Sequence, residues 1–326
     1  MQSKKIVILG TGGTIAGAAS SALDSRDYIA AQRGVGDLVA GLPPPAGYEL
    51  LSEQVAQVDS KNMDVAVWQD LLIACRRWLA RDDVQGLVIT HGTDTLEETA
   101  YLLQAVLAPT KPVVLTCAML PATALGADGP RNLLDAMVVA AYPGACGTVV
   151  TCAGKIHGAQ DVQKLHSWQL DAYSSGDAGV LGRINQAGIV MYRDWPRGTA
   201  LSEAVFDWLV KAASWPRVEI VLSHAGAGAA MVDALVSHAL GRQLGAEPLR
   251  GLVAATTGGG TLHHQLAQAL ERAQACGIRV IRASRCALGG IPGRPDDVFA
   301  GAGSLSPVKA RLQLLLELAA DSQASC

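Results

Sequence analysis

Two clusters of hydroxyl-bearing residues in this sequence have the composition and setting of a covalent active site. The first, GTGGTIAG, covers residues 10–17, and the second, HGTDTLEET, covers residues 91–99. Each follows a short apolar run, so each is predicted to be a turn at the end of a buried strand. Ligands of open parallel sheets bind outside the carboxyl ends of the strands, where both turns would present hydroxyl groups to one crevice. Hydroxyl groups in such a position suggest nucleophilic catalysis.

Neither cluster matches a nucleotide-binding motif. Ile15 stands where a dinucleotide fingerprint requires its third glycine, and the turn is not followed by the Gly-Lys-Ser/Thr of a phosphate loop. The first turn, which exposes Thr14, could therefore be structural. The second supplies a hydroxyl group from Thr93 and a carboxylate from Asp94, although Asp94 could instead cap a helix. Two such turns in consecutive strand–helix units favour a shared site.

Length, composition and charge narrow the class of protein. A prior of about 100–200 residues per domain predicts two domains for a chain of 326 residues. The net charge of −3 gives no electrostatic reason to expect binding to nucleic acid or to an anionic membrane. The seven cysteines include no Cys-x-x-Cys pair, which favours free thiols over a disulfide framework or a zinc site.

The amino-terminal sequence bears on the cellular compartment. Residues 1–5, MQSKK, lead directly into a strand-like run without the apolar core of a signal peptide. The sequence also contains no apolar run long enough to span a bilayer. The expected compartment is therefore the cytoplasm.

Strand-like and helix-like segments alternate along the chain. Strands are predicted at residues 5–9, 86–90, 112–116, 148–152, 188–192, 218–223, 250–255 and 278–283, and helices at 64–80, 97–107, 131–141, 229–240, 262–275 and 307–319. This alternation predicts an α/β fold with a mostly parallel sheet and flanking helices. The pattern breaks around residues 193–217, which predicts a larger N-terminal catalytic α/β domain (1–193), a linker (194–217) and a smaller C-terminal α/β domain (218–326).

A polar segment without periodicity, residues 18–34, follows the first turn directly. Loops of this kind often close over a substrate and exclude water, so we expect a lid. The segment contains Tyr28, and a single loop tyrosine is usually a packing residue with its hydroxyl group in water. Only its place beside the glycine turn favours a functional role.

The two clusters resemble the two signature sequences of the bacterial-type L-asparaginases, with long matches in TGGTIAG and HGTDTLEETA. Further landmarks agree, and the resemblance spans nearly the whole chain. These landmarks are DSKNM (59–63), similar to the substrate-binding loop; AMLP (118–121) with ADGPRNL (127–133), similar to a third stretch; DVQK (161–164), similar to the segment of the catalytic lysine; and SLSPVKAR (304–311) near the carboxyl end.

The resemblance implies hydrolysis of the side-chain amide of L-asparagine to L-aspartate and ammonia through a threonine acyl-enzyme. By position, Thr14 would be the nucleophile and Tyr28 would assist it. Thr93, Asp94 and Lys164 would form a second catalytic group. A threonine hydroxyl group needs such activation because it is a poor nucleophile, and a desolvated lysine can act as a base.

The same resemblance implies how the substrate is bound. Ser60 and Asp94 would hold its amino-acid head, and the backbone at Ala118 would contact its amide. Asp94 suits an α-ammonium group through a charge-assisted hydrogen bond, and backbone N–H groups of glycine turns can stabilise an oxyanion. No metal or organic cofactor is implied. Members of the family form dimers that usually pair into tetramers, with each site between the N-terminal domain of one subunit and the C-terminal domain of its partner.

Three departures from the family pattern leave the substrate preference open. Lys61 stands where many members have glutamine, and its cation could either pair with the substrate carboxylate or point away into solvent. Thr261 stands where a partner-subunit asparagine is expected, and residues 288–297 offer no glutamate. A mixed glutaminase-asparaginase and a non-catalytic amino-acid sensor are the alternatives. An amidotransferase subunit is disfavoured because such subunits carry an extra N-terminal domain.

Overall fold

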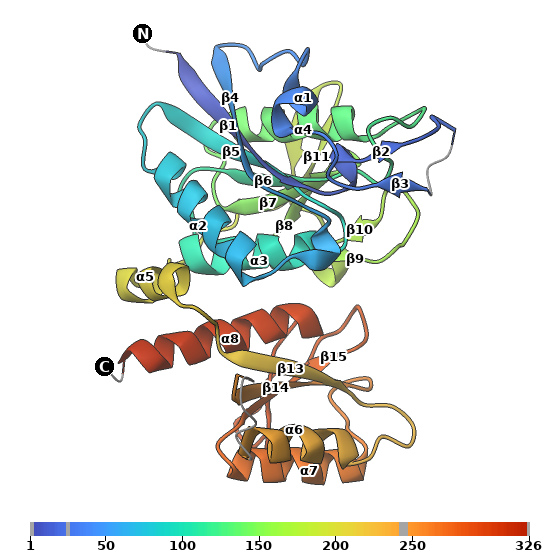
Figure 1. Ribbon diagram of the computed structural model, residues 1–326, viewed down its shortest axis with the longest axis vertical. Helices are drawn as coiled ribbons and strands as arrows, with labels where there is room; N and C mark the ends of the chain where they lie inside the picture. Colours follow the sequence, from blue (N-terminus) through green and yellow to red (C-terminus); the bar gives the residue numbers. More distant parts are fainter. Residues whose placement is uncertain (1–2, 24–26, 241–246, 325–326) are drawn as a thin grey trace. The chain divides into compact units, whose positions relative to one another are not determined.

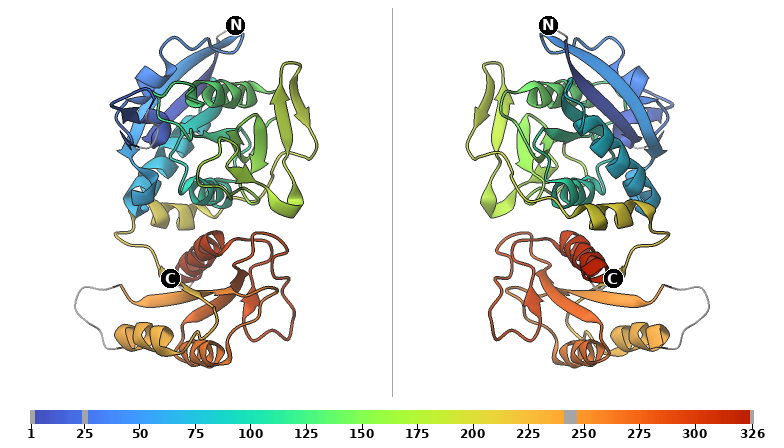
Figure 2. Two further views of the ribbon diagram at one scale, coloured as in Figure 1. Left: turned by 90° about the vertical axis from the view of Figure 1, so that its right-hand side faces the viewer. Right: turned by 90° about the vertical axis from the view of Figure 1, so that its left-hand side faces the viewer.

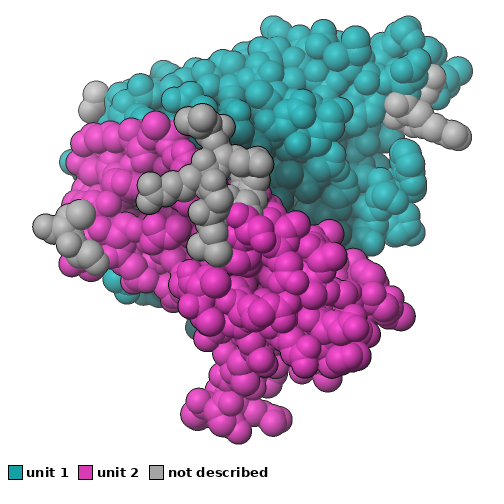
Figure 3. Space-filling model, turned by 60° about the horizontal axis from the view of Figure 1, so that its bottom comes forward, with its two compact units in different colours: residues 1–201 teal, residues 202–326 magenta. Residues whose placement is uncertain are grey.

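The computed structural model describes residues 3–23, 27–240 and 247–324. The chain divides into two compact units, residues 1–201 and 202–326, which are coloured separately in Figure 3. The boundary lies inside the segment predicted as a linker (194–217). That segment also contains a helix, α5 (Glu203–Lys211), which begins where the Ser202 side chain accepts a hydrogen bond from the Val205 N–H group.

Unit 1 is built on an eight-stranded sheet of order β12-β11-β8-β7-β6-β5-β1-β4 (Figure 1). Five neighbouring strands run parallel to one another, namely β4, β1, β5, β6 and β7. The other three strands, β8, β11 and β12, pair antiparallel with their neighbours. The predicted mostly parallel α/β sheet is therefore confirmed. The strands are β1 (Lys4–Gly12), β4 (Tyr48–Val58), β5 (Val84–Thr90), β6 (Val113–Thr116), β7 (Thr148–Cys152), β8 (Lys155–Gly158), β11 (Gly182–Asn185) and β12 (Gly188–Met191).

The strand order reverses at β1. The chain passes from β1 to β4 on one side and then to β5 on the other, so β1 lies between them. In open α/β sheets such a reversal leaves a crevice beyond the carboxyl ends of the two strands, where ligands bind. Both hydroxyl-bearing turns emerge there, since one follows β1 and the other follows β5.

Helices cover both faces of this sheet (Figures 1 and 2). Helices α1 (Val35–Val39) and α4 (Gly129–Ala141) pack with Ile6, Ile8 and Val88 on one face. Helices α2 (Val65–Leu79) and α3 (Leu96–Leu107) contact the sheet from the other. A strand that is buried on both faces is an apolar run, without the alternation of apolar and polar residues seen in half-exposed strands. Strands β1 and β5 have this apolar pattern.

Unit 2 is a smaller α/β layer structure. Its parallel sheet has the order β13-β14-β15-β16, with β13 (Arg217–Leu222), β14 (Leu249–Thr256), β15 (Arg279–Ser284) and β16 (Ala300–Gly301). Helices α6 (Ala230–Leu240) and α7 (His264–Ala275) share one hydrophobic core with the sheet, and α8 (Pro307–Ala324) contacts both the sheet and α5. Within the described residues, no helix combines the length and apolar character needed to cross a membrane.

All predicted strands and helices are present, with ends shifted by a few residues. Several elements had no prediction, and they are β4, β8, β11, β16, α1 and α5. Strand β4 alternates half-buried with exposed side chains at the edge of the sheet, and α1 is five residues long. Two short strand pairs also form: β2 (Ala18–Ala19) with β3 (Tyr28–Ile29), inside the segment predicted to be a lid, and β9 (Gln163–Lys164) with β10 (Tyr173–Ser174).

Two glycines bring the hydroxyl-bearing turns into backbone contact. Gly13 has a φ of 80°, and a Cβ atom there would lie 2.3 Å from the Cα and N atoms of Gly92. A Cβ atom at Gly92 would lie 2.4 Å from the Ser60 Oγ atom. The loops after β1, β4 and β5 therefore meet at a point where side chains beyond glycine do not fit.

A buried chain of hydrogen bonds holds the turn after β5. The Trp68 indole N–H donates to Thr99 Oγ1 at 3.0 Å, and Thr99 Oγ1 lies 2.9 Å from His91 Nε2. His91 Nδ1 lies 2.8 Å from the Gly92 carbonyl oxygen, which can only accept. His91 is therefore protonated on Nδ1 and accepts from Thr99 on Nε2. Burial lowers the pKa of His91 from 6.5 to about 4, which keeps the ring neutral.

The glycine contact predicts the effect of Gly13→Ala. The added methyl group meets backbone atoms that cannot rotate away, at a φ that alanine rarely adopts. We expect the free energy of unfolding, measured with urea, to fall by about 3 kcal/mol or more. Gly36→Ala is the matched control, because no atom lies within 4 Å of its added Cβ. Equal stability of the two variants would contradict the close contact.

The His91 environment predicts a pH dependence of stability. Between pH 6.5 and pH 4 the unfolded chain binds a proton that the folded chain excludes. The stabilisation by neutral His91 is thus complete above pH 6.5 and is lost as the pH falls towards 4. From pH 7 to pH 5 this group should lower the free energy of unfolding by about 2 kcal/mol.

Urea denaturation of His91→Gln and of the exposed-histidine control His224→Gln tests this pH dependence. The His91→Gln protein should lose that part of the slope between pH 7 and pH 5, while His224→Gln should keep it. An unchanged slope in His91→Gln would show that the acid sensitivity arises elsewhere.

Candidate active site

Thr14 begins a single 3₁₀ turn, η1 (Thr14–Ala16), directly after β1. Its side chain is nearly buried, and its Oγ1 atom lies 2.7 Å from the hydroxyl oxygen of Tyr28. Tyr28 belongs to β3 of the short β2–β3 pair, within the segment predicted to be a lid. The structure therefore brings these two predicted residues together, with either hydroxyl group able to donate.

Thr93, Asp94 and Lys164 form the second group of polar side chains. The Lys164 ammonium donates to Thr93 Oγ1 at 2.8 Å and to Asp94 Oδ1 at 2.7 Å. The lysine side chain is 17% exposed, whereas that of Asp94 is 54% exposed. The lysine thus reaches the turn after β5 from the β9 strand, and the carboxylate remains accessible from the cavity.

The turn after β4 supplies the third part of the site. Ser60 begins the 3₁₀ turn η2 (Ser60–Asn62) and is almost fully buried. Its Oγ atom accepts from the Asp94 N–H group at 3.2 Å, and its carbonyl oxygen accepts from the Thr95 hydroxyl group at 2.8 Å. Lys61 lines the cavity and forms an ion pair with Asp59 at 2.9 Å.

The Lys61 ammonium is held in its charged form. The hydrogen bond with Asp59 and the charge of that carboxylate raise the pKa of Lys61. Its side chain is 65% exposed, so the cation is available to an anionic group in the cavity.

Asp128 orders the loop that follows β6. Its carboxylate accepts hydrogen bonds from the N–H groups of Met119 and Leu120 at 3.0–3.1 Å, and from the Asn132 amide at 3.1 Å. The preceding residue, Ala118, is fully buried, while Met119 and Leu120 line the cavity. Asp128 thus fixes the backbone at the position predicted to contact the substrate amide.

The β9–β10 hairpin places two further aromatic residues beside the site. Tyr173 pairs with Lys164 across the hairpin, and its hydroxyl group donates to the Thr93 carbonyl oxygen at 2.6 Å. Burial raises the pKa of Tyr173 well above its usual range, so it remains a neutral donor. Trp168, in the tip of the same hairpin, is 74% exposed and lines the cavity.

Cys117 is an inert thiol behind this site. It is buried beside Tyr173, and the neighbouring Cys152 thiol together with burial raises its pKa well above the usual range. The six cysteines of the described residues are all free thiols. A nucleophilic role for Cys117 is therefore disfavoured, and its contact is one of packing.

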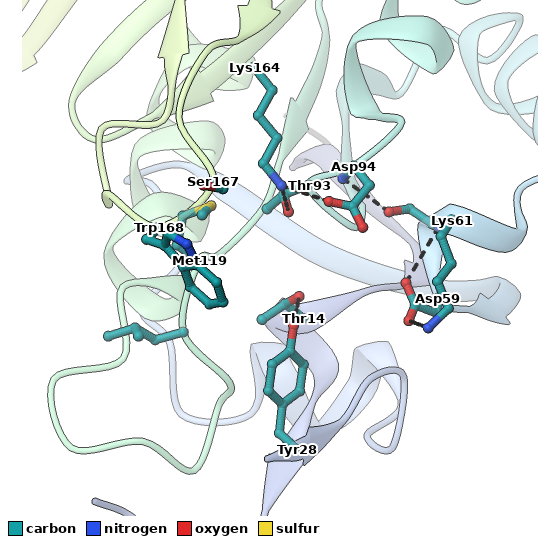
Figure 4. Close-up of a pocket in the computed structure, with 12 residues that line it drawn as sticks. Thr14, Tyr28, Asp59, Lys61, Thr93, Asp94, Met119, Lys164, Ser167 and Trp168 are labelled. Atoms are coloured by element: carbon teal, nitrogen blue, oxygen red, sulfur yellow. Dashed lines mark hydrogen bonds and ion pairs between the residues drawn. The ribbon is translucent and has the colours of Figure 1, made fainter. Parts of the chain in front are cut away.

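The Thr14–Tyr28 pair, the Thr93–Asp94–Lys164 group and the turn after β4 all line one cavity of about 810 Å³ (Figure 4). Of the residues predicted from the sequence, Ala118 does not line it. Five residues that line the cavity had no role predicted from the sequence: Asp59, Met119, Leu120, Ser167 and Trp168. The first three lie in the asparaginase-like segments 59–63 and 118–121. The cavity is lined by Thr14, Tyr28, Asp59, Ser60, Lys61, Thr93, Asp94, Met119, Leu120, Lys164, Ser167 and Trp168.

The cavity lining lies within unit 1, whereas Thr261 and residues 288–297 belong to unit 2. The Thr261 hydroxyl group is within 3.0 Å of both the hydroxyl and carbonyl oxygens of Thr257.

Trp168 could have been predicted as a cavity residue from the sequence, because it is a large aromatic residue four positions after the predicted catalytic lysine.

Two family models and several known proteins match this chain over nearly its full length. The family model "Asparaginase, N-terminal" matches residues 5–197, and "Glutaminase/Asparaginase C-terminal domain" matches residues 217–325. L-asparaginase 2 of Bacillus subtilis (strain 168) is 36% identical, covering 96% of this chain and 82% of the relative. Glutaminase-asparaginase of Pseudomonas fluorescens biotype A is 35% identical, covering 96% and 86%.

A solved structure is similar over the same extent. The crystal structure of a probable cytoplasmic L-asparaginase from Campylobacter jejuni has a TM-score of 0.87 and 33% identity, covering 99% of this chain and 98% of that chain. With two domain models matched in order and relatives above 30% identity over nearly the full length, this chain belongs to the asparaginase/glutaminase family of amidohydrolases.

Proposed function

We propose that this protein is an L-asparaginase that hydrolyses the side-chain amide of L-asparagine to L-aspartate and ammonia through an acyl-enzyme on Thr14. The observation that carries the proposal is the meeting of two separate hydroxyl groups in one cavity. Thr14 is paired with Tyr28, and Thr93 is paired with Lys164 and Asp94. A binding protein for an amino acid has no need of both pairs.

Acylation requires a partner that takes the proton of the threonine hydroxyl group. We assign this role to Tyr28, which is supported by the 2.7 Å distance between its oxygen and Thr14 Oγ1. Thr14 Oγ1 attacks the amide carbon while Tyr28 accepts its proton and passes its own phenol proton on to the leaving nitrogen. The C–N bond breaks, and the nitrogen leaves as ammonia. Backbone N–H groups of the glycine turns would stabilise the oxyanion that forms.

Deacylation requires a water molecule oriented at the ester carbon. Because Thr93 Oγ1 accepts a hydrogen bond from Lys164, its own proton is available to donate to a substrate oxygen or to that water molecule. Asp94 neutralises Lys164 and holds its ammonium against Thr93. Asp94 also retains exposed carboxylate surface on which an α-ammonium group can bind.

A mixed glutaminase-asparaginase is the alternative that a specific observation favours. One relative bears that name and is 35% identical over 96% of this chain. Glutamine is longer than asparagine by one methylene, which a pocket discriminates by only about 1–3 kcal/mol. The cavity of about 810 Å³ has room for either amide.

Assembly and location are further parts of the proposal. We infer a homo-oligomer, either a dimer or a dimer of dimers, because the family resemblance implies that a partner subunit completes each site. We also infer a cytoplasmic location, which is supported by the name of the Campylobacter jejuni protein. The Haemophilus influenzae relative is named a probable periplasmic L-asparaginase, so fractionation of the native host is the deciding measurement.

Ammonia release from the purified protein, with L-asparagine and L-glutamine compared over a concentration series, tests the activity. We expect turnover of asparagine, and Thr14→Ala should lower kcat by at least about 10⁴-fold while substrate binding persists. Thr14→Ser is the matched control, since it retains a hydroxyl nucleophile. Unchanged activity in Thr14→Ala would refute the nucleophile, and binding without turnover in the wild type would favour a sensor.

Lys61 is expected to act on substrate binding rather than on the chemical step. Lys61→Gln should raise KM for asparagine a few-fold, with little change in kcat, because the lost contact is made equally in ground and transition states. Lys211→Gln is the control, since Lys211 forms a comparable exposed ion pair with Asp207 at 2.9 Å. A change in kcat alone for Lys61→Gln would contradict this role.

A further inference from the structure

The segment that carries Tyr28 is fastened to the turn after β1 at Ala31. The Ala31 N–H group donates to the Gly13 carbonyl oxygen at 3.0 Å, and Gly13 directly precedes Thr14. Ala31 lies only three residues after Tyr28 in the chain. The position of Ala31 therefore limits where the Tyr28 hydroxyl group can lie relative to Thr14, which it contacts in the cavity (Figure 4).

Ala31 has a backbone conformation that alanine rarely adopts. Its φ is 55°, in the left-handed region where the Cβ atom crowds the backbone. A residue keeps such a conformation only when the surrounding structure holds it there. Ala31 is buried, and its methyl group lies so close to Gly12 that a Cβ atom added to Gly12 would approach it to 2.9 Å. Tertiary contacts, and not the preference of alanine, thus hold the backbone at Ala31.

Gln57, near the end of β4, supplies a side chain for this purpose. Its amide Nε2 atom donates to the Ala31 carbonyl oxygen at 2.6 Å. The next residue, Val58, accepts from the Gly13 N–H group through its carbonyl oxygen at 2.9 Å. Gln57, Ala31, Gly13 and Val58 therefore form a closed ring of hydrogen bonds, which joins the end of β4 to the residue before the proposed nucleophile.

The same ring lies next to the turn after β4. Asp59 and Ser60 directly follow Val58 and line the cavity. Gln57 itself is not among the described residues of the cavity lining. An effect of Gln57 on catalysis must therefore pass through the residues that it holds, and not through contact with the substrate.

We propose that Gln57 is a positioning residue for the chemical step, because by holding Ala31 it keeps the Tyr28 hydroxyl group beside the nucleophile. This inference rests on the proposed role of Tyr28 in accepting the Thr14 proton. Loss of the Gln57 contact releases the chain three residues after Tyr28, while Ser60 and Asp94 remain in place for the substrate head group.

Gln57→Glu in the purified full-length protein tests this role with a nearly isosteric change. A carboxylate cannot donate to the Ala31 carbonyl oxygen. We expect kcat for asparagine to fall by about three- to tenfold, the size expected for loss of one partly buried hydrogen bond, with KM nearly unchanged. Gln85→Glu is the matched control, because Gln85 accepts from Lys4 at 3.1 Å, as glutamate can, at the start of β5.

Combination with Tyr28→Phe separates this role from a general structural one. If Gln57 acts through the Tyr28 hydroxyl group, Gln57→Glu should lower kcat no further in the Tyr28→Phe protein. Equal losses of kcat in both backgrounds would overturn the proposal. A rise in KM without loss of kcat would also overturn it, because the effect would then lie in substrate binding.

Hydrogen exchange supplies a readout that does not depend on turnover. The N–H groups of residues 31–33, which donate to the carbonyl oxygens of Gly13 and Ala16, should exchange several-fold faster in Gln57→Glu and remain unchanged in Gln85→Glu. Unchanged exchange in Gln57→Glu would show that Gln57 does not hold this segment, and the proposal would fail.

The outcomes distinguish this inference from the function on which it rests. Loss of kcat in Tyr28→Phe without loss in Gln57→Glu would overturn the positioning role and leave the asparaginase proposal standing. Full kcat in Tyr28→Phe would refute the role of Tyr28 and the positioning role together. Absence of asparagine turnover in the wild type would overturn the proposed function itself, and with it the positioning role.

Discussion

The contact between Gly13 and Gly92 is the constraint on which the candidate site depends. It brings the turns after β1 and β5 to backbone distance, and Ser60 closes against Gly92 from the turn after β4. Three loops therefore meet without intervening side chains. The positions of Thr14 and Thr93 are consequently set by the packing of main chain beside a buried sheet, where close packing leaves little room for displacement.

Around this contact, the neutral groups are buried behind the cavity, and the charged groups line it. Burial keeps His91 and Tyr173 uncharged, and both act through hydrogen bonds to the backbone of residues 92 and 93. The charged residues of the cavity lining are two carboxylates and two ammonium groups, which pair as Asp59 with Lys61 and Asp94 with Lys164. This arrangement leaves the cavity lining without a large net charge.

Sequence reasoning reached the features that depend on local pattern. The apolar runs of β1 and β5 and the glycine turns after them predicted the crevice. Seven of the eight site residues predicted from the resemblance line the cavity of the structure, and their roles stay predictions. It could not find β4, whose half-buried alternation depends on its edge position. Nor could it assign Tyr173 or Asp128, because their roles arise from contacts with residues distant in sequence.

Different contacts hold the paired ends and the tip of the β9–β10 hairpin. Its paired ends hold Lys164 against Thr93 and Tyr173 against the backbone of the same residue, whereas its tip is ordered locally by His166. Substitutions in the tip can therefore change the cavity lining at Ser167 and Trp168 without breaking the contacts that hold Lys164. Two adjacent segments of one hairpin thus shape the same cavity through contacts that do not depend on one another.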